Sequence, residues 1–552
     1  MRGGQMRRRE FISLLAGSAT AVGVARAASR AGSLGLDLRV PLSLATCCII
    51  NRMDPEAGFR PWFALDVRDG VPTRLRHDSW DHGDMSGRFL EGLILARHMV
   101  PASADMLQAE ARIRAYLVSV LGSAGVIVNP DTGRRDHPFS QGSALYGLVT
   151  DFNDSGAPEA RQRIEALIRG LDASASHRRD YLVFDELATP LAPCSQHAAY
   201  QVLPVMRFHE LTGDPQALDY ARRLSRWAFY HDPTVTVDGV ITQKGWEGHL
   251  HAWMDTYTGI LRCARAGGDP PLKEVVERSR KMFAWVLEHE TTPYGWVADS
   301  VGSGTCETCT ISSAIRLALE LIREGDAGYW NDIERFVRNQ LVQNQFRNVD
   351  GLGIRDQRVA RGLLGAFDSY ADPNTLIANR NGTIEGCCIN GGIRGLYLAY
   401  QNAIHESAQS IHVNLLLSHG TPGIEVASHL PDEGRLELHL NCSKDVVLRC
   451  PDWVRLADVA IDAPAGIRGA ALPDTHSLRI VGGRPGIRIT IRFAQRRLVQ
   501  ESVVAGRRYQ VSWHGDTVTG ITPAGEPYRL YRTGAGPGPG TGGPYRQPRI
   551  AS

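Results

Sequence analysis

The sequence predicts a multidomain α+β protein in which a closed helical toroid of the (α/α)6 type is followed by a C-terminal β-sandwich. Three observations support this fold class. Apolar residues recur with a helical period from about residue 84 to residue 405, the helices come in pairs joined by similar turns, and the period changes to two after residue 410. The length of 552 residues accommodates several domains.

The composition is globular and nearly balanced in charge. Lys and Arg number 61 and Asp and Glu number 59, and 43% of the residues are hydrophobic. Without a basic excess we expect no nucleic-acid partner. Beyond the N-terminus no apolar run reaches the ~18 residues of a membrane helix, which excludes a polytopic membrane protein. The sequence leaves the oligomeric state open.

Residues 1–27 have the features of a twin-arginine-type signal peptide. Residues 8–12 read RREFI, a short apolar stretch follows, and Ala25-Arg26-Ala27 is a small-residue cleavage site. The alternative is a signal anchor that stays uncleaved. Cleavage predicts a periplasmic or secreted protein that has no membrane contact once the signal is removed.

Residues 28–405 are expected to form the toroid, with short strands and loops at residues 35–80 and a first helix over Met85–Met99. Turns rich in Gly and Asp then recur about every 55–60 residues, and each Gly suits the end of one helix while each Asp can cap the next. The Asp residues are Asp154, Asp214, Asp269 and Asp326. About six such hairpins would close a toroid, and an open helical solenoid is the alternative. Toroids of this kind commonly belong to carbohydrate-active enzymes, although a fold does not fix a function.

Residues 406–532 are expected to form the β-sandwich. Gln510–Ser512 and Tyr528–Tyr531 are expected to add edge strands, and the Gly- and Pro-rich residues 533–552 a disordered tail. The segments with strand-like patterns are Ile411–Leu417, Ile424–Leu430, Arg435–Leu440, Val446–Cys450 and Ile487–Phe493.

The cysteines form two clusters, each just before an apolar helix. One is Cys306-Glu307-Thr308-Cys309 and the other is Cys387-Cys388. The N-terminus of a helix favours a thiolate, and thiolates with a carboxylate suit a four-coordinate zinc ion. Three alternatives remain: a C-x-x-C redox pair, disulfides formed after export, and ordinary buried cysteines.

These clusters resemble the motifs of glycoside hydrolase family 127, the β-L-arabinofuranosidase-like enzymes of the six-hairpin glycosidase superfamily. The resemblance rests on Glu307-Thr308-Cys309 and on Cys387-Cys388, each followed by a helix. It extends over about residues 75–500. Its weaker elements are Val413-Asn414-Leu415, the segment 449–453, Gly248-His249 and the pair Cys194 and His197.

The resemblance implies a zinc ion held by Glu307, Cys309, Cys387 and Cys388, with Cys387 as the nucleophile of a retaining glycosidase. The implied substrate is an arabinofuranoside-like oligosaccharide or glycoconjugate. Cys306 departs from the simple pattern. If its thiolate displaced Glu307, the result would be a closed structural site without an open position for catalysis.

The contacts with the sugar and the general acid are less well marked. His197 and His249 are expected to contact sugar hydroxyl groups. The family carries a Gly-Glu pair upstream of the Glu307 motif, but here Gly295 is followed by Trp296. The nearest carboxylates are Glu290 and Asp299, and either becomes a general acid/base if burial raises its pKa.

The segment from Trp80 to Asp84 has two interpretations. Trp80 could stack on a sugar while Asp81 or Asp84 binds hydroxyl groups, or an Asp could cap the first helix. Two functions other than hydrolysis also remain open. One is a non-catalytic carbohydrate-binding or structural protein with a structural zinc, and the other is a polysaccharide lyase.

Overall fold

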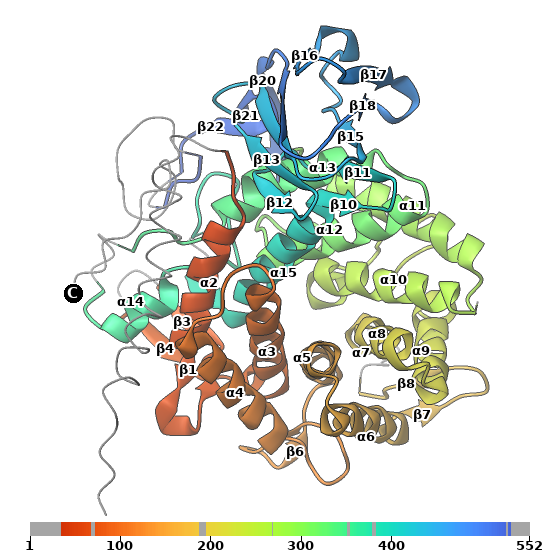
Figure 1. Cartoon of the computed structure of the whole chain (residues 1–552). Helices are drawn as coiled ribbons and strands as arrows, with labels where there is room; N and C mark the ends of the chain where they lie inside the picture. The colour runs from red at the N-terminus through yellow and green to blue at the C-terminus, as the bar shows by residue number, and fades with distance from the viewer. Residues whose placement is uncertain are drawn as a thin grey trace, which may run out of the picture.

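The computed structural model describes residues 35–67, 72–186, 195–267, 269–349, 354–377, 382–525 and 528–531. The expected signal peptide, the expected C-terminal tail and Cys194 lie outside these ranges. Figure 1 shows a helical ring with the strands of the C-terminal part above it. No helix in the described ranges is long and apolar enough to cross a membrane.

Six helices in the described part of the chain form a closed inner ring. Each packs against the next along the chain, and the last packs against the first. They are buried on nearly all sides, as expected for helices enclosed by others. The inner helices are α3 (Gly83–Arg97), α5 (Pro138–Ser155), α8 (Val202–Thr212), α10 (Leu250–Arg265), α12 (Thr308–Arg323) and α15 (Gly386–Ala403). Closure confirms the toroid and is incompatible with an open solenoid.

An outer helix packs against each inner helix. These helices bury one face only, as α9 does with Ala217, Tyr220, Ala221 and Leu224. The turns follow the predicted chemistry. Gly213 ends α8 in the left-handed conformation, and Asp214 then accepts two backbone N–H groups of α9. The outer helices are α2 (Arg39–Asn51), α4 (Ala104–Ser119), α6 (Pro158–Ser174), α9 (Pro215–Arg226), α11 (Leu272–His289) and α13 (Tyr329–Phe336).

The expectation of strands and loops over residues 35–80 was wrong for Arg39–Asn51, which forms α2. This helix packs against α15, so the beginning of the described chain supplies the outer partner of the last inner helix. Short strands do follow it. They are β1 (Met53–Asp54), β2 (Arg60–Pro61), β3 (Ala64–Asp66) and β4 (Arg74–Arg76). Strand β3 pairs with β9 (Thr383–Glu385), which leads directly into α15.

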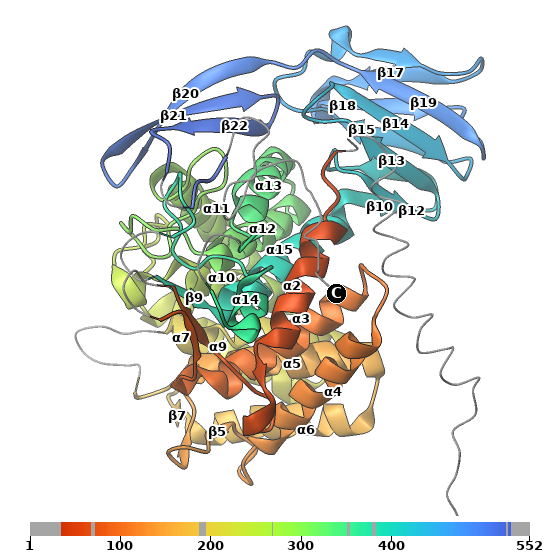
Figure 2. The same ribbon diagram turned by 90° about the vertical axis from the view of Figure 1, so that its left-hand side faces the viewer.

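Two five-stranded sheets form a sandwich beyond the ring (Figure 2). Their strand orders are β10-β11-β15-β18-β17 and β12-β13-β14-β19-β16. Alternate residues of β14 are buried, and the sheets share an apolar core separate from that of the ring. The strands are β10 (Ile404–Glu406), β11 (Ser410–Val413), β12 (His419–Thr421), β13 (Ile424–Ser428), β14 (Arg435–Leu440), β15 (Asp445–Arg449), β16 (Ala460–Asp462), β17 (Arg468–Leu472), β18 (Ser477–Val481) and β19 (Ile487–Arg492).

A third sheet packs on the helical part and not in the sandwich. It consists of β20 (Arg497–Val504), β21 (Arg507–His514) and β22 (Thr517–Thr522), with β21 in the middle. Tyr509, Val511 and Trp513 join the core of the ring. The expected edge strand at Gln510–Ser512 is therefore part of a central strand of this sheet. Residues 528–531 form no strand, although Arg529 makes an isolated bridge.

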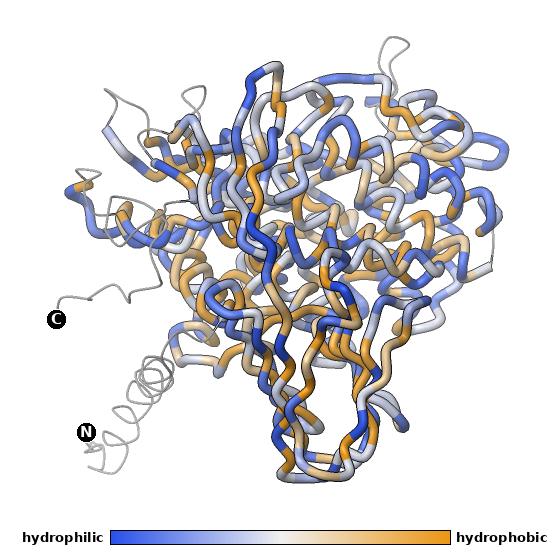
Figure 3. Tube along the Cα trace, turned by 90° about the horizontal axis from the view of Figure 1, so that it is seen from above, coloured by the Kyte–Doolittle hydropathy of each residue, from blue (hydrophilic) through white to orange (hydrophobic). Residues whose placement is uncertain are grey.

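Polar and apolar colours alternate along the strands in Figure 3, which is typical of sheets with one covered face. The fold class predicted from the sequence, a helical toroid followed by a β-domain, is confirmed. The inner helices also fix the position of the cysteine clusters, because α12 and α15 are neighbours in the ring.

Candidate metal centre and active site

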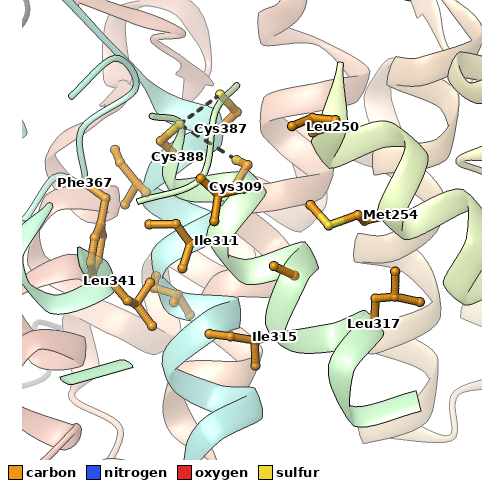
Figure 4. Packing of buried hydrophobic residues seen from close by; sticks show 14 of the residues in the cluster. Leu250, Met254, Cys309, Ile311, Ile315, Leu317, Leu341, Phe367, Cys387 and Cys388 are labelled. Atoms are coloured by element: carbon orange, nitrogen blue, oxygen red, sulfur yellow. Dashed lines mark hydrogen bonds between the residues drawn. The ribbon is translucent and has the colours of Figure 1, made fainter. Parts of the chain in front are cut away.

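The four predicted metal ligands lie together at one end of the inner ring. Glu307 directly precedes α12 and Cys309 lies in its first turn, while Cys387 and Cys388 lie in the first turn of α15. Figure 4 shows the three sulfur atoms at the ends of these two neighbouring helices. All four residues are buried, and their potential ligand atoms lie within 4.8 Å of one another.

The separations of these atoms fit a tetrahedral zinc site. The Sγ atoms of Cys309 and Cys388, and those of Cys387 and Cys388, are 3.8 Å apart. A tetrahedral zinc ion with bonds of ~2.3 Å to sulfur separates two sulfur ligands by about 3.8 Å. Oε1 of Glu307 lies 3.6 Å from Cys388 Sγ and 3.9 Å from Cys387 Sγ. The four residues could therefore hold one metal ion.

The sulfur positions bear on one of the alternatives for these cysteines, the disulfides. A disulfide requires two sulfur atoms ~2.0 Å apart, and the three cysteines are all free thiols here. Cys306 is buried but outside the cluster. Its backbone pairs with Ala371, and the Asn344 side-chain amide donates to its Sγ over 3.8 Å. Glu307, and not Cys306, thus completes the group of four.

The pKa values of the thiols and of the carboxyl group are shifted in different directions. Burial favours the neutral thiol, but hydrogen bonds from Cys387 and Cys388, together with the nearby Arg88, hold the pKa of Cys309 well below its usual value. Hydrogen bonds with Cys309 and Cys388, together with burial, raise the pKa of Cys387. Burial, followed by the charge of Cys309, raises the pKa of Glu307 to about 7. Thiolates and carboxylates bind metals in their deprotonated forms, so a divalent cation bound here would displace the protons that the group still holds.

The two predicted sugar-binding histidines lie beside this cluster. His249, just before α10, contacts Glu307 with Nε2 at 2.8 Å, and its Nδ1 atom is buried without a hydrogen-bond partner in the described part of the chain. His197 lies in the short helix α7 (Gln196–Ala199), with its ring centroid 6.4 Å from that of His249. Burial lowers the pKa of His197 well below its usual value, so its imidazole is neutral.

Aromatic rings cover the two histidines. The indole of Trp246 lies 4.1 Å from the ring of His197, stacks on His249 at 5.4 Å, and lies 5.8 Å from Trp80. His137 packs against both Trp80 and His197. Trp246 and His137 were not singled out from the sequence. For Trp246 a signal existed, because it lies two residues before Gly248 of the Gly248-His249 pair on the same short segment.

The two predicted acid/base candidates differ in their surroundings. Both carboxylate oxygens of Glu290 accept the Gly302 N–H, at 3.1 and 3.0 Å. This buried side chain thus stabilises the loop between residues 290 and 302. Asp299 is half-buried and accepts longer bonds from Thr305 at 3.3 Å and from Ser300 at 3.4 Å. The backbone carbonyl of Asp299 accepts the N–H of Leu250 at 3.0 Å, and Ser300 pairs with His249, which places Asp299 beside the histidine that contacts Glu307.

A third carboxylate, Glu385, was missed in the sequence. It is the last residue of β9, and its Oε2 lies 3.6 Å from Cys387 Sγ. The Tyr370 hydroxyl donates to its other oxygen at 3.0 Å. Burial and then the charge of Glu307 raise the pKa of Glu385 to about 7. Its position two residues before the cysteine pair was the available signal.

The acidic residues before α3 have structural partners. Asp81 is fully buried and accepts from Arg60 and from the backbone N–H of Phe63, each at 2.8 Å. Asp84 forms an ion pair with Arg88 at 2.7 Å. Neither carboxylate caps α3, whose N-cap residue His82 makes no side-chain capping bond, so their roles are structural and the expected Asp cap was wrong. Trp80 does lie on the aromatic side of the site.

Comparisons with known proteins agree with this architecture. No family model matches the chain, and no curated protein matches its sequence. Solved structures do match. A family 127 β-L-arabinofuranosidase from Geobacillus stearothermophilus T6 is 12% identical with a TM-score of 0.56, over 80% of this chain and 76% of that one.

Two further structures are as similar. A family 127 β-arabinofuranosidase is 14% identical with a TM-score of 0.59, over 80% of this chain and 75% of that chain. A protein described as a glycoside hydrolase is 15% identical with a TM-score of 0.58, over 79% of this chain and 77% of that chain. The predicted resemblance to glycoside hydrolase family 127 is therefore confirmed at the level of the fold.

Proposed function

We propose that the chain is an exported glycoside hydrolase of the retaining type, with Cys387 as its nucleophile and with zinc held by Glu307, Cys309, Cys387 and Cys388. The proposed substrate is an arabinofuranoside-like oligosaccharide. One observation carries the proposal: the four ligand atoms lie within 4.8 Å of one another, in a toroid whose fold is that of β-L-arabinofuranosidases.

Cys387 is the sulfur ligand best placed to meet a substrate. It keeps 7% of its surface exposed, whereas Cys309 and Cys388 are fully enclosed. When bound, zinc would keep the Cys387 sulfur ionised at neutral pH, and an ionised sulfur is a strong nucleophile.

The reaction then has two steps. The Cys387 sulfur attacks the anomeric carbon and forms a C–S bond, while the C–O bond to the leaving group breaks and a general acid protonates the leaving oxygen. The same acidic residue, now a base, takes a proton from a water molecule whose oxygen attacks the anomeric carbon. The C–S bond breaks, its electron pair returns to sulfur, and two inversions give overall retention.

We propose Asp299 as the general acid/base. Glu290, the second candidate from the sequence, has both oxygens engaged by the backbone of its own loop. Glu385 lies 3.6 Å from the nucleophilic sulfur, closer than the ~5–5.5 Å that separates the acid and the nucleophile in retaining enzymes. That position suits a contact with the sugar or with Cys387 better than protonation of the leaving oxygen.

His197 and His249 are proposed to contact the sugar. The imidazole of His249 lies between Glu307 and Trp246, and that of His197 packs on the same indole. The buried Nδ1 of His249 can donate or accept one hydrogen bond. An unmet buried polar atom costs ~1–3 kcal/mol, so a hydroxyl group that satisfies it would bind favourably.

Metal analysis and product analysis of the purified protein test the proposal together. We expect one zinc ion per chain and release of a reducing sugar from arabinofuranosides. An unsaturated product that absorbs ultraviolet light would indicate a lyase, and binding without any product would indicate a carbohydrate-binding protein. A metal-free protein with full activity would overturn the mechanism.

Export is part of the same proposal and rests on residues 1–27. Replacement of Arg8 and Arg9 by Lys should leave the uncleaved chain in the cytoplasm, because the twin-arginine pathway reads that pair. Cell fractionation with detection of a C-terminal tag measures this outcome. Unchanged export of the double variant would contradict a twin-arginine signal.

A further inference from the structure

A buried arginine lies against one of the proposed metal ligands. Arg88, on inner helix α3, is almost completely enclosed, and its Nη1 lies 3.9 Å from the Sγ of Cys309. An arginine side chain is seldom buried without partners, because moving its charge out of water is costly. The burial of the Arg88 side chain must therefore be compensated by its contacts.

Every side of the Arg88 guanidinium has a partner. Its Nε donates to Asp84 Oδ1 at 2.7 Å, and Asp84 in turn accepts from the Ser143 hydroxyl. Its Nη2 lies 3.3 Å from Nε2 of His251, whose other ring nitrogen contacts the Ser313 hydroxyl at 2.6 Å. These contacts fix the planar group so that the remaining N–H group points at sulfur.

The negative charge of the cluster explains why a cation next to Cys309 is favourable. Three thiolates and one carboxylate carry more negative charge than a divalent cation neutralises. The excess lies in a buried region, where an uncompensated charge is strongly unfavourable. Arg88 presents the positive end of its ion pair with Asp84 to this region. A nearby cation that donates a hydrogen bond to a ligand sulfur stabilises the metal-bound cluster.

We propose that Arg88 is a positioning residue of the metal centre, which holds Cys309 by an N–H···S contact and offsets the excess negative charge of the loaded cluster. This inference rests on the proposed function, because it requires the four residues to bind a metal. Arg88 does not contact the substrate in this proposal. Its effect is on the affinity of the cluster for zinc.

A structural role for Arg88 in the inner ring is the competing explanation, and Arg394 provides a matched control. Arg394 is equally buried, lies on inner helix α15, and forms an ion pair with Glu91 on α3. Arg394 thus resembles Arg88 in burial and in pairing with a carboxylate of the ring, but its ion-pair partners are Glu91 and Asp255 and none of the four cluster residues. Both R88M and R394M should lower thermal stability.

Competition with a chromophoric chelator measures zinc affinity of the folded, full-length variants. We expect R88M to bind zinc 10–100-fold more weakly than the unmodified protein, the usual effect of losing a partner of a metal ligand. The zinc affinity of R394M should stay within about threefold of that of the unmodified protein, because Arg394 pairs with Glu91 on the ring and not with the cluster. In the cobalt-substituted proteins, R88M alone should shift the sulfur-to-cobalt charge-transfer band.

The variant R88Q keeps the test decisive if R88M does not fold. It retains N–H groups that can donate to Asp84 but lacks the charge, and we expect it also to bind zinc at least fivefold more weakly. Zinc affinity of a folded R88M or R88Q equal to that of the unmodified protein would overturn the inference. Failure of the unmodified protein to bind zinc would instead overturn the proposed function, so the two failures are distinguishable.

Discussion

At the residue scale, the roles proposed for Cys387 and its neighbours follow from small differences in position. The three thiols lie almost at the corners of one tetrahedron, yet only Cys387 retains exposed surface and a carboxylate neighbour outside the group of four, Glu385. Ligand and nucleophile would then be the same atom, and the neighbouring thiols would serve as ligands alone.

The first prediction concerns the nucleophile. Cys387→Ala removes the sulfur that we propose as the nucleophile, so kcat/KM on an aryl arabinofuranoside should fall by a factor on the order of 10⁴ or more. Cys450→Ala, a buried cysteine of the sandwich core, is the control and should keep its activity. Mass spectrometry of the quenched unmodified enzyme should find a glycosyl group on Cys387. Full hydrolysis by Cys387→Ala would exclude this residue as the nucleophile.

The second prediction concerns the general acid. Asp299→Asn should slow hydrolysis of substrates with poor leaving groups far more than that of activated aryl substrates, because only the former need a proton from the enzyme. Steady-state rates over a series of aryl leaving groups measure the dependence. Glu290→Gln should weaken the loop that Gly302 closes without changing that dependence. If Asp299→Asn shows no such dependence and Glu385→Gln does, the acid is Glu385.

The third prediction concerns the exposed indole over the histidines. Trp246 is 44% exposed, and its ring stacks on His249. Trp246→Ala should raise KM by about tenfold through loss of ~1–1.5 kcal/mol of stacking, with little change in kcat. Val237→Ala, which changes a more exposed apolar residue, should alter neither parameter. A fall in kcat alone would mean that Trp246 does not form part of the binding surface.

At the scale of helices and strands, patterns within one segment were predictable, whereas contacts between segments were predictable only where the family resemblance supplied them. The repeated Gly and Asp turns predicted the hairpins, and the motifs at Glu307 and Cys387 predicted two helix starts at one site. Arg88 was missed because only a tertiary contact brings α3 to the cluster. Glu385 was missed although it lies only two residues before Cys387 in the sequence. The acid/base loop stays a prediction.

Helix α2 was missed for a related reason. Leu42, Ala45 and Ile49 recur at helical spacing. The same segment contains β-branched residues, whose local preference is for strands. Its burial against α15 decides the outcome, because that inner helix needs an outer partner and no later helix supplies one in the described part of the chain. Tertiary packing thus overrides local preference here.

The fourth prediction tests this closure of the ring. Ile49→Ala empties a fully buried position on α2, so the free energy of unfolding should fall by ~2–5 kcal/mol. Cys47→Ala changes an exposed residue of the same helix and should leave the stability within ~0.5 kcal/mol. Urea denaturation followed by circular dichroism measures both variants. Equal stability of the two would mean that α2 does not complete the ring.

At the scale of the whole molecule, the cluster connects two inner helices whose ligands lie about 80 residues apart in the sequence. A metal ion there would bind the folded ring but not the separated ligands of the unfolded chain. Its binding free energy would therefore add to the stability of the helical part as a unit. The β-sandwich has its own core and should not share this stabilisation.

The fifth prediction follows from that coupling. Removal of zinc with a chelator should lower the Tm of the helical part by an amount that corresponds to at least ~2.7 kcal/mol, the stabilisation expected at a free zinc concentration of 100 times the Kd. Zinc should restore the Tm and magnesium should not, because thiolates bind the softer ion. The double variant Cys309→Ala, Cys388→Ala should start at the lower Tm and respond to neither treatment. A chelator effect that persists in this variant would place the stabilising metal elsewhere in the chain.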